Sequence, residues 1–275
     1  MKVIYDIGAN NGDDIQYYLK KADRVVAVEA NPSLCDIIRT KFRSEIANGT
    51  LVVENCVLTP HKEQGTIPFY IHTKYHGLSQ VSRPKNNQSD YEKVLLPRRS
   101  VESLFAKHGY PHYVKIDVEG YDHVILRSMF ANSIFPQYIS AESHVIEVFL
   151  LLSCSGRYNH FKLVEGYSVP DKYGQHIITT IRGAETYSFP MYSSGPYGED
   201  LDGEWMPAKR LFKLLTSQGL GWKDIHAMNQ DLPASTFKEA KIKYYRLKLQ
   251  WIASRIRIKL SKIFARLGVG LFRLG

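Results

Sequence analysis

The sequence is poor in cysteine. Its 275 residues contain three, Cys35, Cys56 and Cys154, and no two of them have the spacing of a zinc site or of a C-x-x-C redox motif. So small and odd a number excludes a disulfide-stapled secreted domain and is typical of buried thiols in a reducing compartment. The cysteine content therefore predicts a cytoplasmic protein.

Long apolar segments are also lacking. No run of about 18 apolar residues occurs, so we expect no membrane-spanning helix. Lys2 is followed by a short strand pattern and a turn, not by a long apolar region, so we expect no secretory signal peptide. A hydrophobic content of 44% is ordinary for a chain that buries a core.

Acidic residues are scarce at one end of the chain only. Residues 238–275 hold eleven of the 36 basic residues but one of the 27 acidic residues, Glu239. The rest of the chain carries 25 basic and 26 acidic side chains and is close to neutral. Any anionic partner is therefore predicted to bind the C-terminal segment.

Strand and helix patterns alternate through the first 145 residues. The predicted strands cover 2–7, 24–30, 51–58, 65–72, 113–119 and 137–143, and the predicted helices cover 11–22, 32–45, 100–109 and 121–130. This alternation predicts an α/β fold, Rossmann-like, with a mostly parallel central sheet flanked by helices. A helix over 146–156, a strand over 160–169, loops through 170–205 and a helix over 206–218 complete a domain that we place at residues 1–235.

Residues 236–275 are predicted to form a basic amphipathic helix. Apolar side chains recur there every three or four residues, at Ile242, Tyr245, Leu249, Ile252, Ile256, Leu260, Ile263 and Leu267. A helix of this kind can lie in an anionic membrane interface, which would make the protein peripheral on the inner face of the membrane. Docking on the body or on a second subunit is the alternative.

Nucleic acid is not expected as a partner. The chain lacks the [DNS]-P-P-[YF] motif of amino-methylating DNA enzymes and has no Pro-Cys nucleophile pair. The sequence gives no indication of the oligomeric state.

The first strand–helix turn, DIGANNGD at residues 6–13, has two glycines, Gly8 and Gly12, where a dinucleotide site has three. Carboxylates at Asp6, Asp13 and Asp14 would repel a diphosphate. They suit a ligand that carries a cation and no phosphate, and S-adenosylmethionine fits that description. An NAD-dependent oxidoreductase is the rival interpretation. It requires a third glycine in this turn, which the sequence does not have.

The second strand ends at Glu29, about twenty residues after the turn, where a carboxylate can accept both hydroxyls of a ribose. NAD-binding proteins bind the ribose with a carboxylate at the same place. Glu29 therefore supports an adenosine-containing ligand but does not distinguish S-adenosylmethionine from NAD. Asn55 and Cys56, at the end of the third strand, are placed to line an adenine pocket.

Three segments resemble the FkbM-type methyltransferases, a branch of the class I S-adenosylmethionine-dependent enzymes. They are DIGANNGD (6–13), VVAVEANP (25–32) and, most specifically, VKIDVEGYDHVIL (114–126). The resemblance covers residues 3–145, and residues 162–205 look like a later part found in some members. It implies a Rossmann-like sheet, transfer of a methyl group to oxygen, and often a sugar or polyketide hydroxyl as acceptor. Asp122 stands where the family commonly has Glu.

The turn, the strand ends and the resemblance together predict the cofactor contacts, with Asp117 near the methionine part. These contacts are Asp6, Gly8, Asn10, Asn11, Glu29, Ala30, Asn55, Cys56 and Asp117.

The reaction needs a base, because a sugar hydroxyl is a weak nucleophile. We predict Glu142 or His144, at the end of the fifth strand of the parallel sheet, as the base, and Glu119 as the residue that orients the acceptor. A less favoured alternative is a Mg²⁺ ion held by Asp117, Glu142 and His144.

Two loops are candidates for binding the acceptor. His76 and Arg83, within 74–84, suit a phosphate or carboxylate on the substrate. Tyr197 and Trp205, within 193–205, could stack on a sugar ring, and Asp200 and Asp202 could bind its hydroxyls; a turn-rich surface loop is the alternative.

The resulting hypothesis is an O-methyltransferase acting on a carbohydrate, in a polysaccharide, a glycolipid or a nucleotide-sugar. A polyketide or other small-molecule hydroxyl is the first alternative. An NAD-dependent oxidoreductase and a non-catalytic membrane-associated scaffold are more remote.

Overall fold

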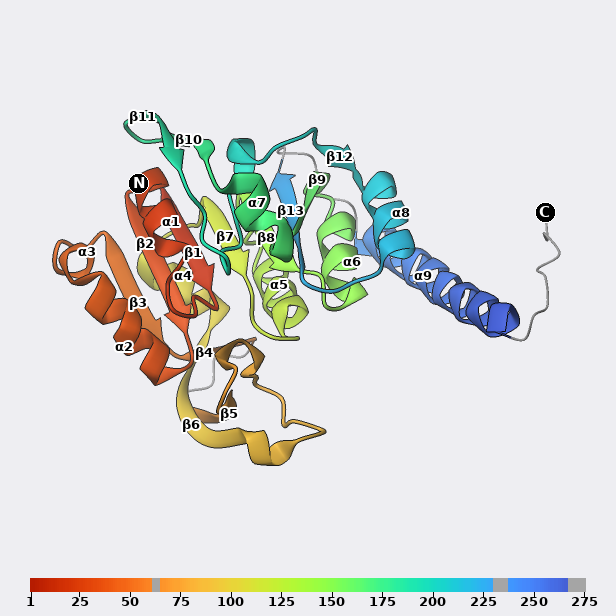
Figure 1. The fold of residues 1–275 in the computed structure, drawn as a ribbon, viewed down its shortest axis with the longest axis horizontal. Helices are drawn as coiled ribbons and strands as arrows, with labels where there is room; N and C mark the ends of the chain where they lie inside the picture. The colour runs from red at the N-terminus through yellow and green to blue at the C-terminus, as the bar shows by residue number, and fades with distance from the viewer. Residues whose placement is uncertain (61–64, 230–236, 267–275) are drawn as a thin grey trace.

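The computed structural model describes residues 1–60, 65–229 and 237–266, which fold around an eight-stranded sheet (Figure 1). Along the sheet the strands follow the order β12-β9-β13-β8-β7-β1-β2-β3. They are β1 (Val3–Ile7), β2 (Arg24–Glu29), β3 (Leu51–Asn55), β7 (Tyr113–Ile116), β8 (Tyr138–Glu142), β9 (Tyr158–Glu165), β12 (Met206–Pro207) and β13 (Lys223–Asn229). The five strands from β3 to β8 are parallel, whereas β13 runs antiparallel to both of its neighbours, β8 and β9. The predicted α/β fold with a mostly parallel sheet is confirmed.

Helices cover both faces of this sheet. They are α1 (Ile15–Lys21), α2 (Pro32–Lys41), α3 (Arg43–Ala47), α4 (Val101–His108), α5 (Asp122–Ala131), α6 (Ile146–Cys154), α7 (Val169–Tyr173), α8 (Ala208–Gln218) and α9 (Phe237–Arg266). Short 3-10 turns occur at His76–Leu78, Gln88–Asp90, Gly166–Ser168 and Gly198–Asp200. Side chains of α4, α5 and α6 share one buried cluster with Tyr5 and Ile7, and side chains of α1, α2 and α7 share another with Ile4. Alternate residues of β1 thus point to opposite layers, as the two-residue period of a strand requires.

Local signals account for several helix ends. Asn31 caps α2 by accepting a hydrogen bond from the Ser33 backbone N–H at 3.1 Å, and Pro32 occupies the first helical position. Ser100 caps α4 in the same way, and α4 ends at Gly109, whose φ of +103° lies in the left-handed region. The helix predicted over 32–45 therefore begins at Pro32, and the helix predicted over 100–109 is closed by Gly109.

A small sheet adjoins the carboxyl ends of the parallel strands. The predicted strand 51–58 breaks at Cys56, and its second part, β4 (Val57–Thr59), pairs with β6 (Tyr91–Ser100), which also pairs with β5 (Thr66–His72). Because β4 follows β3 directly, this three-stranded sheet lies beyond the ends of β2 and β3 (Figure 1). The sequence analysis did not predict β6, since polar residues and Pro97 interrupt its pattern.

One prediction needs correction, and one strand of the main sheet was not predicted. The segment 170–205, expected to be loops only, contains a hairpin of β10 (His176–Thr180) and β11 (Gly183–Tyr187). Strand β13 was not predicted at all, although it occupies a central place between β8 and β9. Its seven residues alternate imperfectly, and the pairing with distant strands that stabilises it cannot be read from a local pattern.

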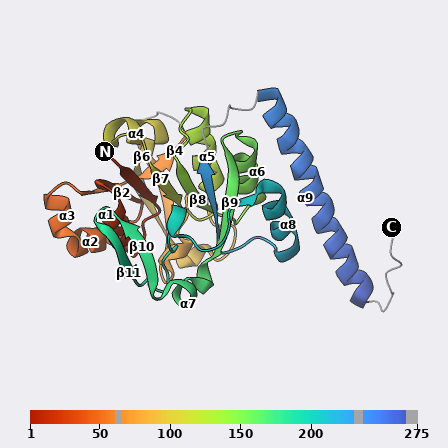
Figure 2. The ribbon, with the colours of Figure 1, turned by 90° about the horizontal axis from the view of Figure 1, so that it is seen from above.

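The predicted C-terminal helix is present as α9, which lies beside α6 and α8 and extends beyond the body (Figure 2). Trp251 is 9% exposed and joins the same buried cluster as α6, and Lys248 Nζ lies 2.7 Å from the Glu147 carboxylate. Helix α9 therefore docks on the body through one of its faces. The predicted boundary at 235/236 and Leu267 lie outside the described residues. Among the residues described, no helix combines the length and apolarity needed to cross a bilayer.

Candidate functional site

The turn after β1 touches the end of β7. Gly8 has a φ of +85°, and a Cβ atom at this position would lie 1.9 Å from the backbone oxygen of Asp117. The Gly8 N–H donates to Val28 O at 2.9 Å, and the Asp117 N–H donates to Ile7 O at 2.9 Å. Glycine is required at residue 8 because no side chain fits between the two strand ends.

An open pocket with a cavity volume of about 110 Å³ lies at the carboxyl ends of β1, β2 and β7. Its walls come from the turn after β1, the end of β2, strands β4 and β5, the loop at 76–81 and residues 117–119. Of the predicted cofactor contacts, Gly8, Asn10, Glu29, Ala30, Cys56 and Asp117 line it.

Glu29 is the most defined contact in this pocket. Its carboxylate is 7% exposed and accepts backbone N–H groups from Asn10 at 2.8 Å and from Asn31 at 2.7 Å. Each oxygen keeps a further lone pair, so two ribose hydroxyls can still be bound. Burial raises the pKa of Glu29 to about 7, despite the two N–H donors, which act in the opposite direction.

Asn55 and Asn11 lie behind the pocket wall and do not line it. The Asn55 amide donates to the backbone oxygens of Glu29 at 2.9 Å and Ala30 at 2.8 Å, so it fixes the chain that follows β2. The Asn11 amide donates to Asp13 at 3.0 Å. Both residues therefore shape the two turns around the pocket, and the structure does not place their side chains in its lining.

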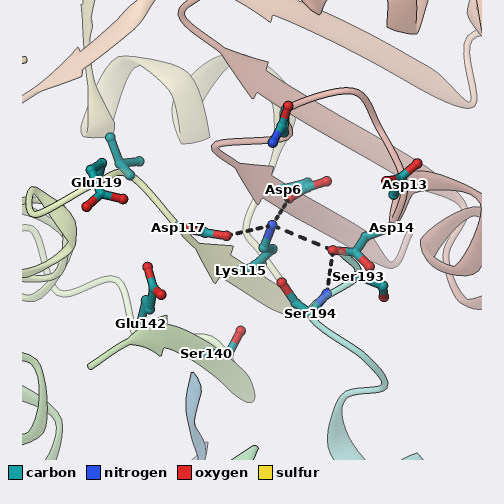
Figure 3. Close-up of polar contacts among 12 residues, drawn as sticks. Asp6, Asp13, Asp14, Lys115, Asp117, Glu119, Ser140, Glu142, Ser193 and Ser194 are labelled. Atoms are coloured by element: carbon teal, nitrogen blue, oxygen red, sulfur yellow. Dashed lines mark hydrogen bonds and ion pairs between the residues drawn. The ribbon is translucent and has the colours of Figure 1, made fainter. Parts of the chain in front are cut away.

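Asp6 is not at the mouth of the site, which corrects the argument from the sequence. Its side chain is buried beside Lys115, whose Nζ lies 3.5 Å from Asp6, 3.6 Å from Asp14 and 3.4 Å from Asp117 (Figure 3). Burial raises the pKa of Asp6 to about 6, partly offset by the ammonium group. Burial lowers the pKa of Lys115, but the carboxylates outweigh it and hold that pKa well above its ordinary value. Only Asp117, whose side chain is 37% exposed, reaches the pocket.

Lys115 was missed by the sequence analysis, although a signal was present: a single cation inside the apolar strand YVKI. A buried lysine needs partners, and the three aspartates of two different strand–helix turns supply them. Ser193 and the Ser194 N–H also bind Asp14 (Figure 3). The segment after β11 therefore closes over the turn after β1.

The three predicted catalytic residues come together beside the pocket. His144 Nε2 lies 2.7 Å from the Glu142 carboxylate and 3.9 Å from that of Glu119, which lines the pocket. The hydrogen bond to Glu142 raises the pKa of His144 to about 9, against the effect of burial. Burial raises the pKa of Glu142 and of Glu119. Glu142 is 5% exposed and lies behind His144, whose side chain is 31% exposed.

A divalent ion would use a set different from the predicted one. One oxygen or nitrogen each of Glu119, Glu142 and His144 lie within 4.8 Å of one another, which is close enough to hold a cation. Asp117, predicted as a ligand, is not in this group, because its carboxylate pairs with Lys115.

The two residues predicted to bind the acceptor from the loop 74–84 lie in different hollows. His76 lines the pocket, whereas Arg83 lines a second hollow with Tyr70 and Lys93, and its guanidinium donates to Gln88 at 3.1 Å. Of these two candidates, only His76 is placed in the pocket lining, and binding of the acceptor by either residue stays a prediction.

Tyr197 and Trp205 lie near the amino ends of β7 and β8, whereas the pocket lies at the carboxyl ends of the parallel strands. This position overturns their predicted contact with the acceptor. Tyr197 is 2% exposed and stacks on Tyr113, the first residue of β7, with ring centroids 3.9 Å apart. Trp205 stacks near Tyr138, the first residue of β8. Asp200, expected to bind hydroxyls, forms a buried ion pair with Lys21. This loop belongs to the core because its aromatic side chains cover the amino ends of the strands.

The sheet order, with β13 antiparallel between β8 and β9, and the pocket at the ends of β1 and β2 define a class I S-adenosylmethionine-dependent methyltransferase fold. The profile of the methyltransferase FkbM domain matches residues 6–150, more than half of the chain, so the chain belongs to the FkbM methyltransferase family. Membership of this family decides the choice of cofactor in favour of S-adenosylmethionine over NAD.

Solved structures of low identity share similarity with this chain. The FkbM methyltransferase of Methylobacillus flagellatus KT is 14% identical over 55% of this chain and 35% of its own length, with a TM-score of 0.36. The StiE O-MT fragment, residues 961–1257, is 8% identical over 92% and 74%, with a TM-score of 0.40. CalS10, an amino pentose methyltransferase of Micromonospora echinaspora, is 8% identical over 83% and 84%, with a TM-score of 0.31. No curated protein matches the sequence.

Proposed function

We propose that this methyltransferase transfers the methyl group to a hydroxyl of a carbohydrate. The observation that carries the proposal is the contact chain from Glu119, in the pocket wall, to His144 at 3.9 Å and on to Glu142 at 2.7 Å. Transfer to oxygen needs a group that takes the hydroxyl proton, and a histidine backed by a carboxylate is suited to that task.

S-adenosylmethionine supplies a methyl carbon that its sulfonium already activates, so the protein must align the acceptor and accept one proton. His144 is the more exposed member of the pair and meets an incoming hydroxyl first. We assign the base to neutral His144 and its orientation to the buried Glu142. Glu119 then accepts a hydrogen bond from a second hydroxyl of the acceptor.

The preference for a carbohydrate rests on the polar groups around this point. Glu119, His76 and Ser79 line the same pocket, and such groups bind neighbouring hydroxyls. A polyketide hydroxyl is the alternative acceptor, because it needs the same base but fewer polar contacts.

A metal-assisted reaction is the second candidate mechanism, favoured by the clustering of Glu119, Glu142 and His144. Such an ion would acidify the acceptor hydroxyl in place of the base. Activity that EDTA abolishes and Mg²⁺ restores would establish this mechanism; activity unchanged in EDTA supports His144 as the base.

Two measurements test the proposal. Calorimetry with S-adenosylhomocysteine should show one site per chain, and the absence of binding would favour a non-catalytic scaffold. Transfer of a labelled methyl group should then be measured with free sugars, nucleotide-sugars, lipid-linked glycans and polyketide alcohols. Transfer to polyketide alcohols alone would refute the carbohydrate part and leave the methyltransferase intact.

A further inference from the structure

Helix α9 presents an apolar stripe to solvent. Six of its side chains are between 45% and 67% exposed: Ile242, Tyr245, Leu249, Ile252, Ile256 and Leu260. At 3.6 residues per turn they occupy an arc of roughly 80° of the helix surface. The sequence predicted this stripe, but the body does not cover it.

The face of α9 that docks is a different one. Trp251, the buried residue of the helix, lies roughly 140° around the axis from the centre of the stripe. Tyr244 and Leu247 pack on the same buried cluster as Trp251, and Lys248 pairs with Glu147 of α6. Because this other face docks, the stripe is turned away from the body, along whose edge α9 lies (Figure 2).

Basic side chains border the stripe on both sides. Arg246 and Arg257 lie along one border and Lys241 and Lys259 along the other, and all four are exposed. Glu239 is the single acidic residue in the sequence from 238 onward. An apolar band between two cationic rows, on a helix held against a folded body, is the arrangement of an interfacial helix.

We propose that this face of α9 lies in the surface of an anionic lipid bilayer. The stripe enters the boundary of the acyl chains while the flanking arginines and lysines meet the headgroups. Two copies of the chain would bring cationic rows together if the stripe were a dimer interface. Nucleic acid would neutralise the rows but would leave the six apolar side chains in water. The lipid surface alone satisfies both features.

The test is flotation of the full-length protein with vesicles of phosphatidylcholine, with and without 30% phosphatidylglycerol. We expect binding to the anionic vesicles only, weakened by raising the salt concentration. The double variants I256E/L260E and R246E/R257E should each reduce the partition coefficient at least tenfold. Because these side chains are exposed, the melting temperature should not change.

The matched control is R43E/R182E, which alters the net charge as R246E/R257E does. Arg43 begins α3 and Arg182 lies between β10 and β11, elements at the end of the molecule away from α9 (Figure 1). It should bind vesicles within twofold of the parent protein. Full-length protein that does not float with anionic vesicles would overturn the proposal, as would equal loss in the control. A concentration-dependent dimer that I256E/L260E dissociates, with no vesicle binding, would assign the stripe to a second copy. Calorimetry with S-adenosylhomocysteine is unaffected in either case, so this proposal and the proposed function fail separately.

Discussion

The ammonium group of Lys115 lies 3.5 Å from the carboxylate of Asp6, and both side chains are buried. The same ammonium lies within 3.6 Å of Asp14 and Asp117, so one cation compensates three acids from two strand ends. The negative charge of the first turn is therefore partly offset inside the protein. Of these three carboxylates, that of Asp117 is partly exposed, so we expect it to be the one that meets a cationic ligand.

Removing this cation should destabilise the fold. Lys115→Met leaves the buried carboxylate of Asp6 without its cation and removes the positive charge beside Asp14. We expect a loss of about 3–5 kcal/mol in the free energy of unfolding at pH 7.5. The folded-state pKa of Asp6, about 6, is above its unfolded value and rises further in the variant. In the variant, the folded state therefore binds a proton at Asp6 more tightly than the unfolded state does. The stability that Lys115→Met loses relative to the parent protein should thus be smaller at pH 5 than at pH 7.5.

Urea unfolding at both pH values measures this effect. The control is Lys20→Met, which removes an ion pair with Glu185 that is partly exposed, and should cost less than about 1 kcal/mol. Equal losses in the two variants would contradict the role given to Lys115.

Alanine at residue 8 should disrupt the site. The new Cβ would lie 1.9 Å from Asp117 O, so the turn must move away from the end of β7. We expect the affinity for S-adenosylhomocysteine to fall at least roughly tenfold, together with about 1–3 kcal/mol of stability from backbone strain. Gly120→Ala is the control, since Gly120 also has positive φ, +68°, but nothing lies within 4 Å of its Cβ position. If both variants bind the ligand alike, the close contact has no role in shaping the pocket.

Cofactor affinity should depend on pH through Glu29. Its pKa of about 7 means that the carboxyl group is mostly protonated at pH 6 and ionised at pH 8. A carboxylate accepts hydrogen bonds from ribose hydroxyls better than a neutral acid, so S-adenosylhomocysteine should bind several-fold more tightly at pH 8. Calorimetry at the two pH values measures this difference. Glu29→Gln should bind weakly and lose the pH dependence; a variant as pH-dependent as the parent would assign the titration elsewhere.

The proposed base should titrate near pH 9. Nuclear magnetic resonance can follow the imidazole signal of His144 as the pH is raised. This signal is assigned as the one that disappears in the variant His144→Gln. In Glu142→Gln the partner that raises the pKa is gone, so the ring should titrate near or below its ordinary value of about 6.5. Glu119→Gln is the control, because its oxygen is 3.9 Å away and its removal should lower the pKa less. Once an acceptor is known, the rate should rise with pH toward 9, and Glu142→Gln should shift that rise to lower pH.

Local signals along the chain account for most of the framework. Strand–helix alternation defined the parallel part of the sheet, Asn31 and Pro32 the start of α2, and Gly109 the end of α4, because these signals act within a few residues of chain. Glu29 could be placed in the pocket for the same reason, since its position at the end of β2 follows from the local pattern.

Other features of the fold and of the site depend on contacts between residues far apart in the chain, and these features became visible in the folded protein alone. The place of β13 between β8 and β9, and the burial of Tyr197 against Tyr113, arise from contacts between segments far apart in sequence. The role of Lys115 as the cation among three aspartates follows from folding, which brings Asp6, Asp14 and Asp117 around it. The apolar period of α9 identified a stripe, but packing on α6 through Trp251 decided that another face docks. Periodicity defines which side chains share a face; it holds no information on which face the rest of the protein will cover.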